Sequence, residues 1–317
     1  MIVVTGAAGF IGANLVGALN AEGRSDVIAV DVPGHGTRYL DAMQVRERVE
    51  RDAFPAWLRE HGNAVEAVLH MGACSDTTCS DREFIMRNNL HYSQELWTIC
   101  AERGIRFVYA SSAATYGDGS NGYDDRCDPA ILMPLNMYGE SKQLFDLWAL
   151  EQKTNPKGWS GLKFFNIYGP HEEHKGRMAS VVLHAFNQIK VNGHVKLFGS
   201  DRPGIPDGGQ MRDFIYVKDV VAAVLYCARA PREAVGAVFN VGTGKARSFA
   251  DLATAVFHAL NLETAIQYIP MPVDLKGKYQ YFTEAKMEKL RASGLARPFY
   301  SLEDGVKDYV TLLNAKA

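Results

Sequence analysis

The sequence predicts an α/β protein built on a doubly wound parallel sheet of the Rossmann type, with a smaller C-terminal lobe interleaved with it. Short apolar runs recur along the chain with helical stretches between them, and a glycine-rich turn follows the first run directly. This alternation is typical of parallel strands joined by crossover helices. The expected strands are Ile2–Thr5, Val27–Asp31, Ala67–His70, Phe107–Ser111 and Leu162–Asn166.

The sequence also predicts helices. Leu144, Leu147 and Leu150 fall three residues apart, which predicts a helix that buries one face through them. Ser248 and Ser301 each precede a series of apolar residues at helical spacing. A serine in that place caps the first turn of a helix, so we expect a helix to begin after each.

The pattern of strands and helices changes in the second half of the chain. A polar stretch at His171–Arg177 and a Gly/Pro-rich loop at Asp201–Gly209 interrupt it. We therefore expect a nucleotide-binding domain at residues 1–169, to which a return segment at about 210–247 also belongs. Residues 170–317 are expected to form mainly a substrate-binding lobe.

Composition and charge favour a globular protein that acts on a small molecule. The 317 residues are 47% hydrophobic and 22% charged, which is enough for a sizeable core. Lys and Arg number 34 against 36 Asp and Glu, so nothing in the overall charge predicts a nucleic-acid or membrane partner. The apolar start of the chain is too short for a signal peptide or a membrane span, and we expect a cytoplasmic protein.

The cysteines and histidines predict no metal site. Five cysteines are scattered without a CxxC pair, which fits free thiols in a reducing compartment. Cys74 and Cys79, like His171 and His174, lack the further ligands that a metal ion needs.

The segment Gly6–Gly12 predicts a pyrophosphate-binding loop because it follows a strand and opens a helix. Gly6 allows the tight turn, Gly9 lets a phosphate approach the backbone, and Gly12 lets the helix pack on the strand. The helix N-terminus then points N–H groups at the pyrophosphate.

The end of the second expected strand predicts the adenosine ribose site. Asp31, with Val32 beside it, lies about 20 residues after the loop, where a carboxylate accepts hydrogen bonds from the ribose. Asp31 alone suggests NAD. Arg38 can reach the same ribose, and a guanidinium there pairs with a 2′-phosphate, so we favour NADP. Arg51 is the second candidate for that phosphate, and a solvated surface charge is the alternative for it.

Tyr138 and Lys142 predict the reacting site. They lie four residues apart, on one face of a helix. A nearby cation and an oxidised nicotinamide both favour the phenolate, which makes Tyr138 a proton acceptor, and Lys142 also holds the nicotinamide ribose. Ser112 ends an expected strand, where doubly wound folds place ligands, and we expect it to hydrogen-bond the reacting hydroxyl.

Together these motifs resemble the extended short-chain dehydrogenase/reductases, and narrower motifs resemble the ADP-L-glycero-D-manno-heptose 6-epimerase family within them. The broader resemblance also rests on Phe165–Pro170, Arg212–Val217 and Phe239–Gly244. The narrower one rests on Gly72–Ser75, Ser112–Tyr116, His174–Ser180 and Leu275–Gln280.

The resemblance implies an isomerase that converts ADP-D-glycero-D-manno-heptose to its L-glycero epimer, a precursor of the lipopolysaccharide core. Tightly bound NADP, one per subunit, takes hydride from C6″, and the hydride returns to the opposite face of a transient ketone. One tyrosine cannot serve both faces, so a second acid/base group is needed. The resemblance also implies a homo-oligomer, with a pentamer as the expected assembly.

Lys175 is the expected second group, since it matches the family in the segment His174–Ser180 and burial can lower its pKa. A phosphate-binding or surface lysine is the alternative from the residues alone. The resemblance implies further cofactor contacts from Phe10, Ile11, Met71, Gly72, Ala73, Cys74, Ser75, Asn88 and Ile167. It implies substrate contacts from Asn166, Arg177, His184, Phe198, Gly199, Ser200, Arg212 and Tyr279.

Two residues depart from the family pattern. Met71 stands where an acidic residue is expected, and Arg177 stands where serine is expected. The loop Asp201–Gly209 is also longer than in the simplest version of the family. All three bear on binding detail more than on the chemistry.

Other functions stay open from the sequence. A UDP-hexose 4-epimerase shares Ser112, Tyr138 and Lys142 but does not need a base at Lys175. A 4,6-dehydratase needs an acid and a base where Ala113 and Ala114 stand, so elimination is disfavoured. A non-catalytic NADP-sensing module is the alternative from another class, and such modules usually lose the tyrosine or the lysine.

Overall fold

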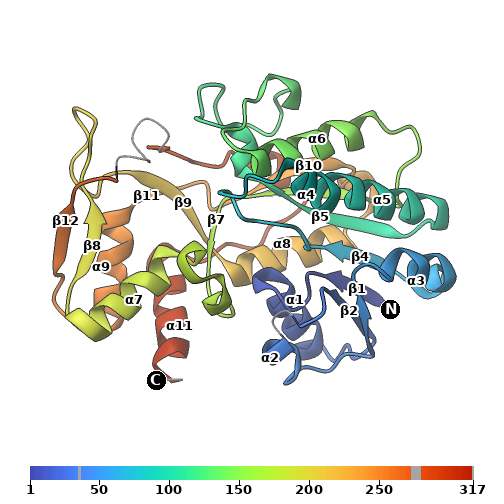
Figure 1. Ribbon diagram of the computed structural model, residues 1–317, viewed down its shortest axis with the longest axis horizontal. Helices are drawn as coiled ribbons and strands as arrows, with labels where there is room; N and C mark the ends of the chain where they lie inside the picture. The colour runs from blue at the N-terminus through green and yellow to red at the C-terminus, as the bar shows by residue number, and fades with distance from the viewer. Residues whose placement is uncertain (35–36, 273–279, 316–317) are drawn as a thin grey trace.

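The computed structural model describes residues 1–34, 37–272 and 280–315, and a seven-stranded sheet lies at its centre (Figure 1). The strand order is β10-β6-β5-β4-β1-β2-β3, and neighbouring strands pair in parallel. This confirms the predicted fold class. The strands are β1 (Ile2–Thr5), β2 (Val27–Asp31), β3 (Glu47–Glu50), β4 (Ala67–His70), β5 (Arg106–Ser112), β6 (Ser160–Phe164) and β10 (Ala237–Val241).

Helices cover both faces of this sheet. One face is covered by α1 and α8, which pack on each other and on the sheet through residues such as Leu15 and Val224. The other face is covered by α3, α5 and α6, which enclose an aromatic core around Trp97 and Phe107. The helices of this part are α1 (Phe10–Ala21), α2 (Thr37–Leu40), α3 (Phe54–His61), α4 (Arg82–Ile85), α5 (Tyr92–Arg103), α6 (Met137–Glu151), α8 (Val217–Arg229) and α10 (Glu288–Ala292).

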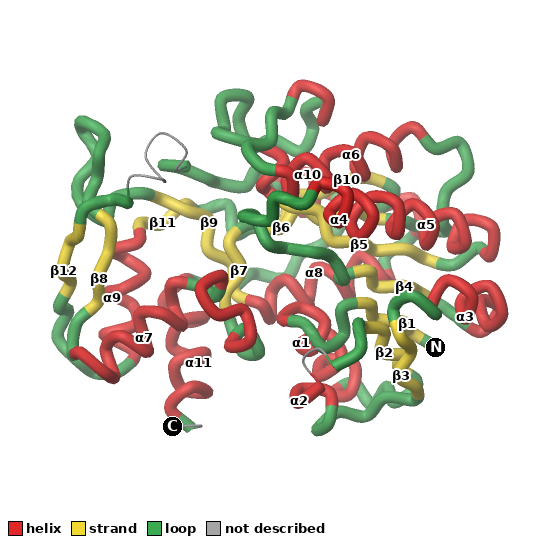
Figure 2. Tube along the Cα trace, in the orientation of Figure 1, coloured by secondary structure: helices red, strands yellow, loops and turns green. Residues whose placement is uncertain are grey.

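A second group of elements lies at the other end of the molecule (Figure 2). It holds a three-stranded sheet, β11-β9-β7, and a two-stranded sheet, β12-β8, packed with three helices around a core of their own. The elements are β7 (Asn166–Tyr168), β8 (Val195–Phe198), β9 (Met211–Tyr216), β11 (Ala246–Ser248), β12 (Ile266–Ile269), α7 (Val181–Asn192), α9 (Phe249–Ala259) and α11 (Leu302–Asn314). The division of the chain near residue 169 stays a prediction.

The predicted strand Leu162–Asn166 is wrong at its end, because the chain changes sheets there. β6 stops at Phe164, and the N–H of Phe165 makes a last hydrogen bond to Val241 O of β10 at 3.1 Å. Asn166 then begins β7, which pairs with β9 of the smaller sheet. The crossing brings the lobe to the edge of the central sheet where the strands end.

The helix starts are confirmed, but the buried face of α6 is not the predicted one. Ser248 caps α9 in a capping box with Asp251, and Ser301 caps α11. On α6, however, Leu150 is 46% exposed, and the inner face carries polar side chains, including Lys142 and Asp146. Apolar spacing therefore marked the wrong face of this helix.

Three further observations concern the described residues. None of their helices combines the length and the apolar character needed to cross a bilayer. They also hold no group of three or more His, Cys, Asp or Glu side chains placed to bind a metal ion. The five cysteines are free thiols.

The close packing of α1 on β1 generates the first prediction. A Cβ on Gly12 would lie 2.0 Å from Gly6 O and 2.8 Å from Ala7 Cα, so Gly12→Ala forces the backbone apart. We expect this variant to lose at least about 2 kcal/mol of unfolding free energy, as overpacked cores do. Gly17→Ala is the control on the same helix, since its Cβ would meet only the Met43 side chain, 3.7 Å away. It should gain up to about 1 kcal/mol from helix propensity. Urea unfolding of both variants checks this, and equal stability would contradict the packing argument.

Candidate active site

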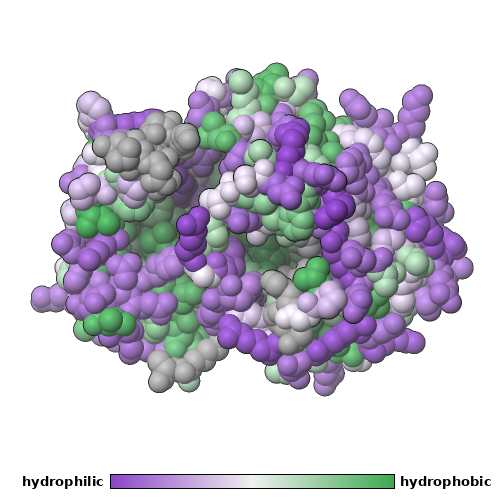
Figure 3. Space-filling view, viewed as in Figure 1, coloured by the Kyte–Doolittle hydropathy of each residue, from purple (hydrophilic) through white to green (hydrophobic). Residues whose placement is uncertain are grey.

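A cleft of about 950 Å³ opens where the central strands end and the smaller lobe approaches them. β1, β2, β5 and β6 all contribute residues to it, as do the loop after β4, the strand β7 and η5, the short 3-10 segment Glu173–Met178. In a doubly wound sheet this edge is the expected ligand site, beside the point where the strand order reverses. The space-filling view is hollowed near its centre, where apolar residues lie inside a hydrophilic rim (Figure 3).

The glycine-rich loop forms the floor of the cleft and has the predicted geometry. Gly6 has a φ of +64°, and a Cβ there would lie 2.7 Å from Gly72 Cα, so the tight turn requires glycine. Gly9 is the N-cap of α1, and because it is a glycine no side chain covers the first turn of the helix there. Phe10 and Ile11 of the first turn also line the cleft. The loop therefore presents backbone and a helix N-terminus to any ligand above it.

Asp31 lies beside this loop at the end of β2. Its carboxylate accepts hydrogen bonds from Ala8 N and Val32 N, both at 2.8 Å. Arg51 lines the cleft next to it, with its guanidinium 4.6 Å from the ring centre of Tyr92. Arg38 does not line the cleft; its guanidinium lies on the Tyr39 ring, 4.6 Å from the centroid. Of the two arginines predicted near the ribose, the structure brings Arg51 to Asp31.

The segment Met71–Ser75 forms one wall of the cleft, and an asparagine holds it. Asn89 accepts a hydrogen bond from Cys74 N at 2.8 Å and donates one to Cys74 O at 2.9 Å. Its predicted neighbour Asn88 lines the cleft and donates to Phe84 O at 2.6 Å. Asn89 was not predicted, because nothing in the sequence distinguishes it from Asn88.

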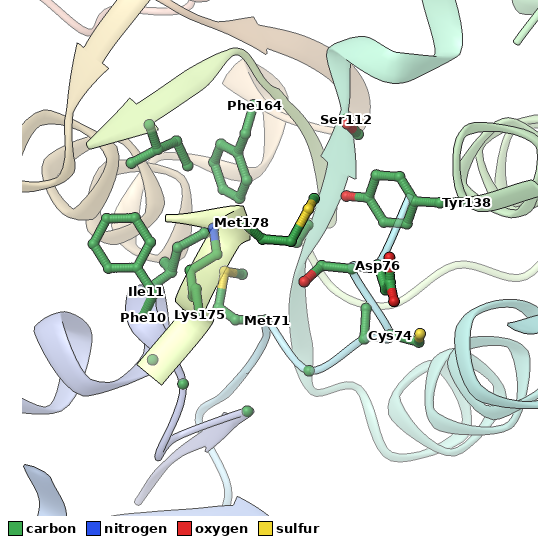
Figure 4. Close-up of a pocket in the computed structure, with 18 of the residues that line it drawn as sticks. Phe10, Ile11, Met71, Cys74, Asp76, Ser112, Tyr138, Phe164, Lys175 and Met178 are labelled. Atoms are coloured by element: carbon green, nitrogen blue, oxygen red, sulfur yellow. The ribbon is translucent and has the colours of Figure 1, made fainter. Parts of the chain in front are cut away.

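Tyr138 and Ser112 lie together on one side of the cleft (Figure 4), and Lys142 also lines it. Burial raises the pKa of the Tyr138 phenol, and a hydrogen bond with Ser112 lowers it in part. Lys142 is buried and donates to Ala110 O at 2.8 Å, and burial lowers the pKa of this ammonium to about 8. The serine, the phenol and the ammonium are therefore in the arrangement that proton transfer at a hydroxyl requires.

Lys175 lies on the opposite side of the cleft, on η5. Its Nζ is 5.3 Å from the centre of the Phe10 ring, and Figure 4 shows it beside Phe10 and Ile11, across from Tyr138. Burial lowers the pKa of Lys175, against an opposing effect of the Glu172 carboxylate. Two titratable groups thus face the cleft from different elements of the fold.

The predicted substrate residues divide into two groups. Asn166 and Arg212 line the cleft, as does Ile167, the predicted cofactor contact, and Arg212 is buried with its guanidinium 5.7 Å from the Phe249 ring centre. Tyr279 lies outside the described residues. The predicted residues that the structure places outside the cleft lining are Arg38, Arg177, His184, Phe198, Gly199 and Ser200.

Several cleft residues were not predicted. Asp76 points into the cleft from the loop after β4, and Met178 lies between Lys175 and Tyr138 (Figure 4). The Asp76 carboxylate accepts hydrogen bonds from Thr78 N and Oγ1, and Arg177 approaches Thr78 Oγ1 at 3.5 Å from the lobe. Thr78 and, to a lesser degree, Arg177 lower the pKa of Asp76. The sequence held one signal of this contact, the arginine at position 177 where serine is expected. In the structure the Arg177 guanidinium approaches the loop that carries Asp76 and Thr78.

The described residues fit a nicotinamide dinucleotide. Gly6 and Gly9 leave the backbone of the loop open to a pyrophosphate, the Asp31 carboxylate lies beside that loop, and Lys142 lines the cleft together with Ser112. The segment Met71–Ser75 lines the same cleft as the glycine-rich loop and Tyr138. The site therefore has a phosphate end and a reacting end within one cleft.

Known proteins match this chain closely. An ADP-L-glycero-D-manno-heptose-6-epimerase of Fusobacterium nucleatum is 49% identical over 100% of this chain and 98% of its own length. One of Nitratidesulfovibrio vulgaris strain DP4 is 52% identical over 98% of this chain and 97% of its own length.

Solved structures agree in fold. The Helicobacter pylori ADP-L-glycero-D-manno-heptose-6-epimerase superposes with a TM-score of 0.82 at 28% identity, over 99% of this chain and 96% of that one. The Thermus thermophilus UDP-glucose 4-epimerase in complex with NAD gives 0.80 at 27% identity, over 100% and 99%.

The model of the NAD dependent epimerase/dehydratase family matches residues 2–242, which include the glycine loop, Ser112, Tyr138, Lys142 and Lys175. Full-length relatives at about half identity agree with that match. The chain therefore belongs to the NAD dependent epimerase/dehydratase family, and it is an epimerase with a nicotinamide cofactor.

Proposed function

We propose that this epimerase inverts C6″ of ADP-D-glycero-D-manno-heptose, with NADP as its cofactor, in the supply of a lipopolysaccharide core precursor. The observation that carries the proposal is the pair of acid/base side chains, Tyr138 and Lys175, on opposite sides of one cleft. Relatives of that name, identical to this chain at 49% and 52% of positions, support the choice of substrate.

Tyr138 is the proposed base for one face of the sugar. When bound, an oxidised nicotinamide supplies the hydride acceptor and a positive charge that favours the phenolate. Tyr138 then accepts the proton of the C6″ hydroxyl, while Ser112 hydrogen-bonds the same oxygen. Lys142, held on Ala110 O, keeps a cation near the phenolate and the cofactor ribose.

Lys175 is the proposed acid for the other face. After the sugar turns, the ketone oxygen lies on the lobe side, where an ammonium donates a proton as hydride returns to carbon. An ordinary lysine holds its proton too tightly to exchange it readily at neutral pH, and burial lowers the pKa of Lys175 toward a useful range.

Elimination is disfavoured by the segment after Ser112. Ala113 and Ala114 carry no acid or base. Thr115 is fully buried, and its hydroxyl donates to Ser112 O at 2.9 Å and accepts from Lys163 at 2.7 Å. No group of these three is available to remove water from a sugar, which supports an epimerase over a dehydratase.

The proposal includes NADP, a cytoplasmic location and a homo-oligomer with a pentamer as its expected form. Arg51, which lines the cleft beside Asp31, is the better placed of the two arginines for a 2′-phosphate. Arg38 would first have to leave the Tyr39 ring. The location and the assembly rest on the resemblance alone.

Substrate choice is tested by incubating the purified protein with ADP-D-glycero-D-manno-heptose and following the C6″ proton by NMR. We expect inversion to an equilibrium mixture of the two epimers. UDP-galactose, incubated in parallel, should give no UDP-glucose. Inversion of UDP-galactose without inversion of the heptose would overturn the substrate proposed here.

The two-sided mechanism predicts that Tyr138→Phe and Lys175→Ala each lower the rate of heptose inversion by at least about 100-fold, the usual contribution of a general acid or base. Lys153→Ala, which removes an exposed lysine, is the control and should keep full activity. Near-normal activity of Lys175→Ala would leave Tyr138 as the single base, as expected of a UDP-hexose 4-epimerase.

Cofactor choice predicts that Arg51→Ala weakens NADP binding by roughly 10-fold to 100-fold, as the loss of charged hydrogen bonds does, and leaves NAD binding unchanged. Arg38→Ala is the matched comparison and should change neither affinity greatly. Calorimetry with each cofactor, after removal of any copurified nucleotide, measures both. Equal affinity of the unmodified protein for NAD and NADP would refute the NADP proposal.

A further inference from the structure

A buried ion pair lies directly beneath the reacting side of the cleft. Lys163 Nζ is 2.7 Å from Asp146 Oδ2, and the two side chains are 2% and 0% exposed. Neither residue lines the cleft or is used by the proposed chemistry. Moving two charges out of water is costly, and apolar residues of similar size would often be as stable here. The pair therefore needs a reason other than stability.

The Asp146 carboxylate is fully engaged by donors from strands β5 and β6. It accepts from Tyr109 Oη at 2.9 Å, from Ser111 Oγ at 2.7 Å and from Lys163. Tyr109 and Ser111 belong to the strand that ends in Ser112. Asp146 thus holds α6 against the strand that carries the proposed substrate-binding serine.

Lys163 extends the same network to the segment after Ser112. Its Nζ also donates to Thr115 Oγ1 at 2.7 Å, and Thr115 donates in turn to Ser112 O at 2.9 Å. Lys163 comes from β6, which pairs with β5 in register Ser111 to Lys163. The strand end that presents Ser112 is therefore fixed from the helix by Asp146 and from the next strand by Lys163.

Asp146 also shares a helix face with the reacting residues. Tyr138, Lys142 and Asp146 are spaced by four residues on α6, so they lie one above another, about 6 Å apart per step. Lys142 and Asp146 are both buried. A charge at Asp146 acts on Lys142 and Tyr138 through protein rather than through water, and such interactions are screened little.

We propose that Asp146 and Lys163 are positioning residues for the epimerase reaction, a buried pair that fixes α6 on β5 and balances the electric field at Tyr138 and Lys142. This inference rests on the proposed roles of Tyr138 and Lys142. Neither Asp146 nor Lys163 touches the substrate or cofactor in this assignment. Each acts through the groups that it holds or faces.

Few other charges face this site. His70 is buried between Thr5 and Ser93, and burial lowers its pKa to about 3, so it is neutral at pH 7. Arg82 and Glu140 pair on the exposed side of α6, where solvent screens them. Lys289 of α10 faces Lys163 from beside Asp125, and burial lowers the pKa of this ammonium. The other titratable groups near the pair or the helix face include thiols and phenols, each with a pKa raised mainly by burial: Cys74, Tyr109, Tyr116 and Cys127.

The sign of the effect follows from the charges. The Asp146 carboxylate disfavours the Tyr138 phenolate, and it stabilises the Lys142 ammonium. Asp146→Asn removes that anion and leaves the Lys163 cation, so the pKa of Tyr138 should fall. Lys163→Met leaves the anion without its partner, so the same pKa should rise. Asp146→Asn/Lys163→Met removes both charges and should restore it.

The experiment measures the Tyr138 titration in the NADP-loaded protein without substrate, by NMR of protein labelled with carbon-13 at the tyrosine Cζ. Tyr138→Phe assigns the signal. We expect Asp146→Asn to lower the titration midpoint, and Lys163→Met to raise it, by about half a pH unit each, the order of a charge interaction over such a distance. Glu140→Gln, on the exposed side of the same helix, is the control and should shift it much less.

A second readout is the pH dependence of heptose inversion. Activity needs the phenolate, so its acidic limb should move to lower pH in Asp146→Asn and to higher pH in Lys163→Met. Lys163→Arg, which keeps the charge, should keep the wild-type limb. A merely structural role predicts a loss of rate or stability with no such opposite shifts, and shifts in the same direction would overturn the proposal.

Two outcomes are kept apart by this design. If Lys163→Met does not fold, the comparison of Asp146→Asn with the double variant decides, since removing the Lys163 cation must raise the midpoint. If the wild-type protein fails to invert the heptose, the proposed substrate fails, while the NMR titration still tests the ion pair. No opposite shift in that titration refutes the ion-pair proposal alone.

Discussion

The contact between α6 and β5 is the constraint on which the reacting side of the site depends. Lys142, a buried cation on the helix, donates to Ala110 O, two residues before Ser112 on the strand. That bond fixes the distance between the helix that carries Tyr138 and the strand end that carries Ser112. A slip of one residue would turn the phenol out of the cleft, because neighbouring positions of a helix face different directions. The buried polar contacts of Asp146 and Lys163 reinforce the same register.

The other side of the site depends on the change of sheet at Phe165. Because β6 ends there and β7 pairs with β9, the segment that follows β7 returns over the cleft and carries Lys175. Had the strand continued in the central sheet, the chain that follows it would not return over the cleft, and Lys175 would not face Tyr138 across it. The two-sided geometry is thus a property of topology, and the residues of the lobe core around Tyr168 and Tyr216 hold it in place.

The short buried strands and the glycine-rich loop could be predicted from the sequence, because one physical rule determines each of them. β1, β2 and β4 have the predicted bounds, since buried parallel strands are short apolar runs with little else to decide them. The glycine loop was predictable because only glycine fits at Gly6 and Gly12. Prediction failed on α6, where Leu144, Leu147 and Leu150 suggested the buried face and a network of charges occupies it instead. The spacing of apolar residues does not predict a helix face that is buried through paired polar groups.

Residues contributed by the lobe were harder to place than those of the sheet. Phe198 ends β8, and Gly199 and Ser200 follow it. β8 pairs with β12 and contributes nothing to the cleft lining, which no spacing in the sequence reveals. From the sequence, Arg38 is the first candidate for the 2′-phosphate and Arg51 the second. In the structure Arg51 lines the cleft, with its guanidinium near the Tyr92 ring, whereas the guanidinium of Arg38 lies on the Tyr39 ring outside the cleft lining.

The position of β10 in the central sheet has a consequence for how the chain is made. β6 is exposed along one edge until residues 237–241 pair with it, and those residues leave the ribosome about seventy-five positions after β6. During synthesis the unfinished domain therefore carries an open strand edge, which is the feature that recruits other chains into aggregates. That edge stays open over the interval, and it closes when the last strand of the sheet docks.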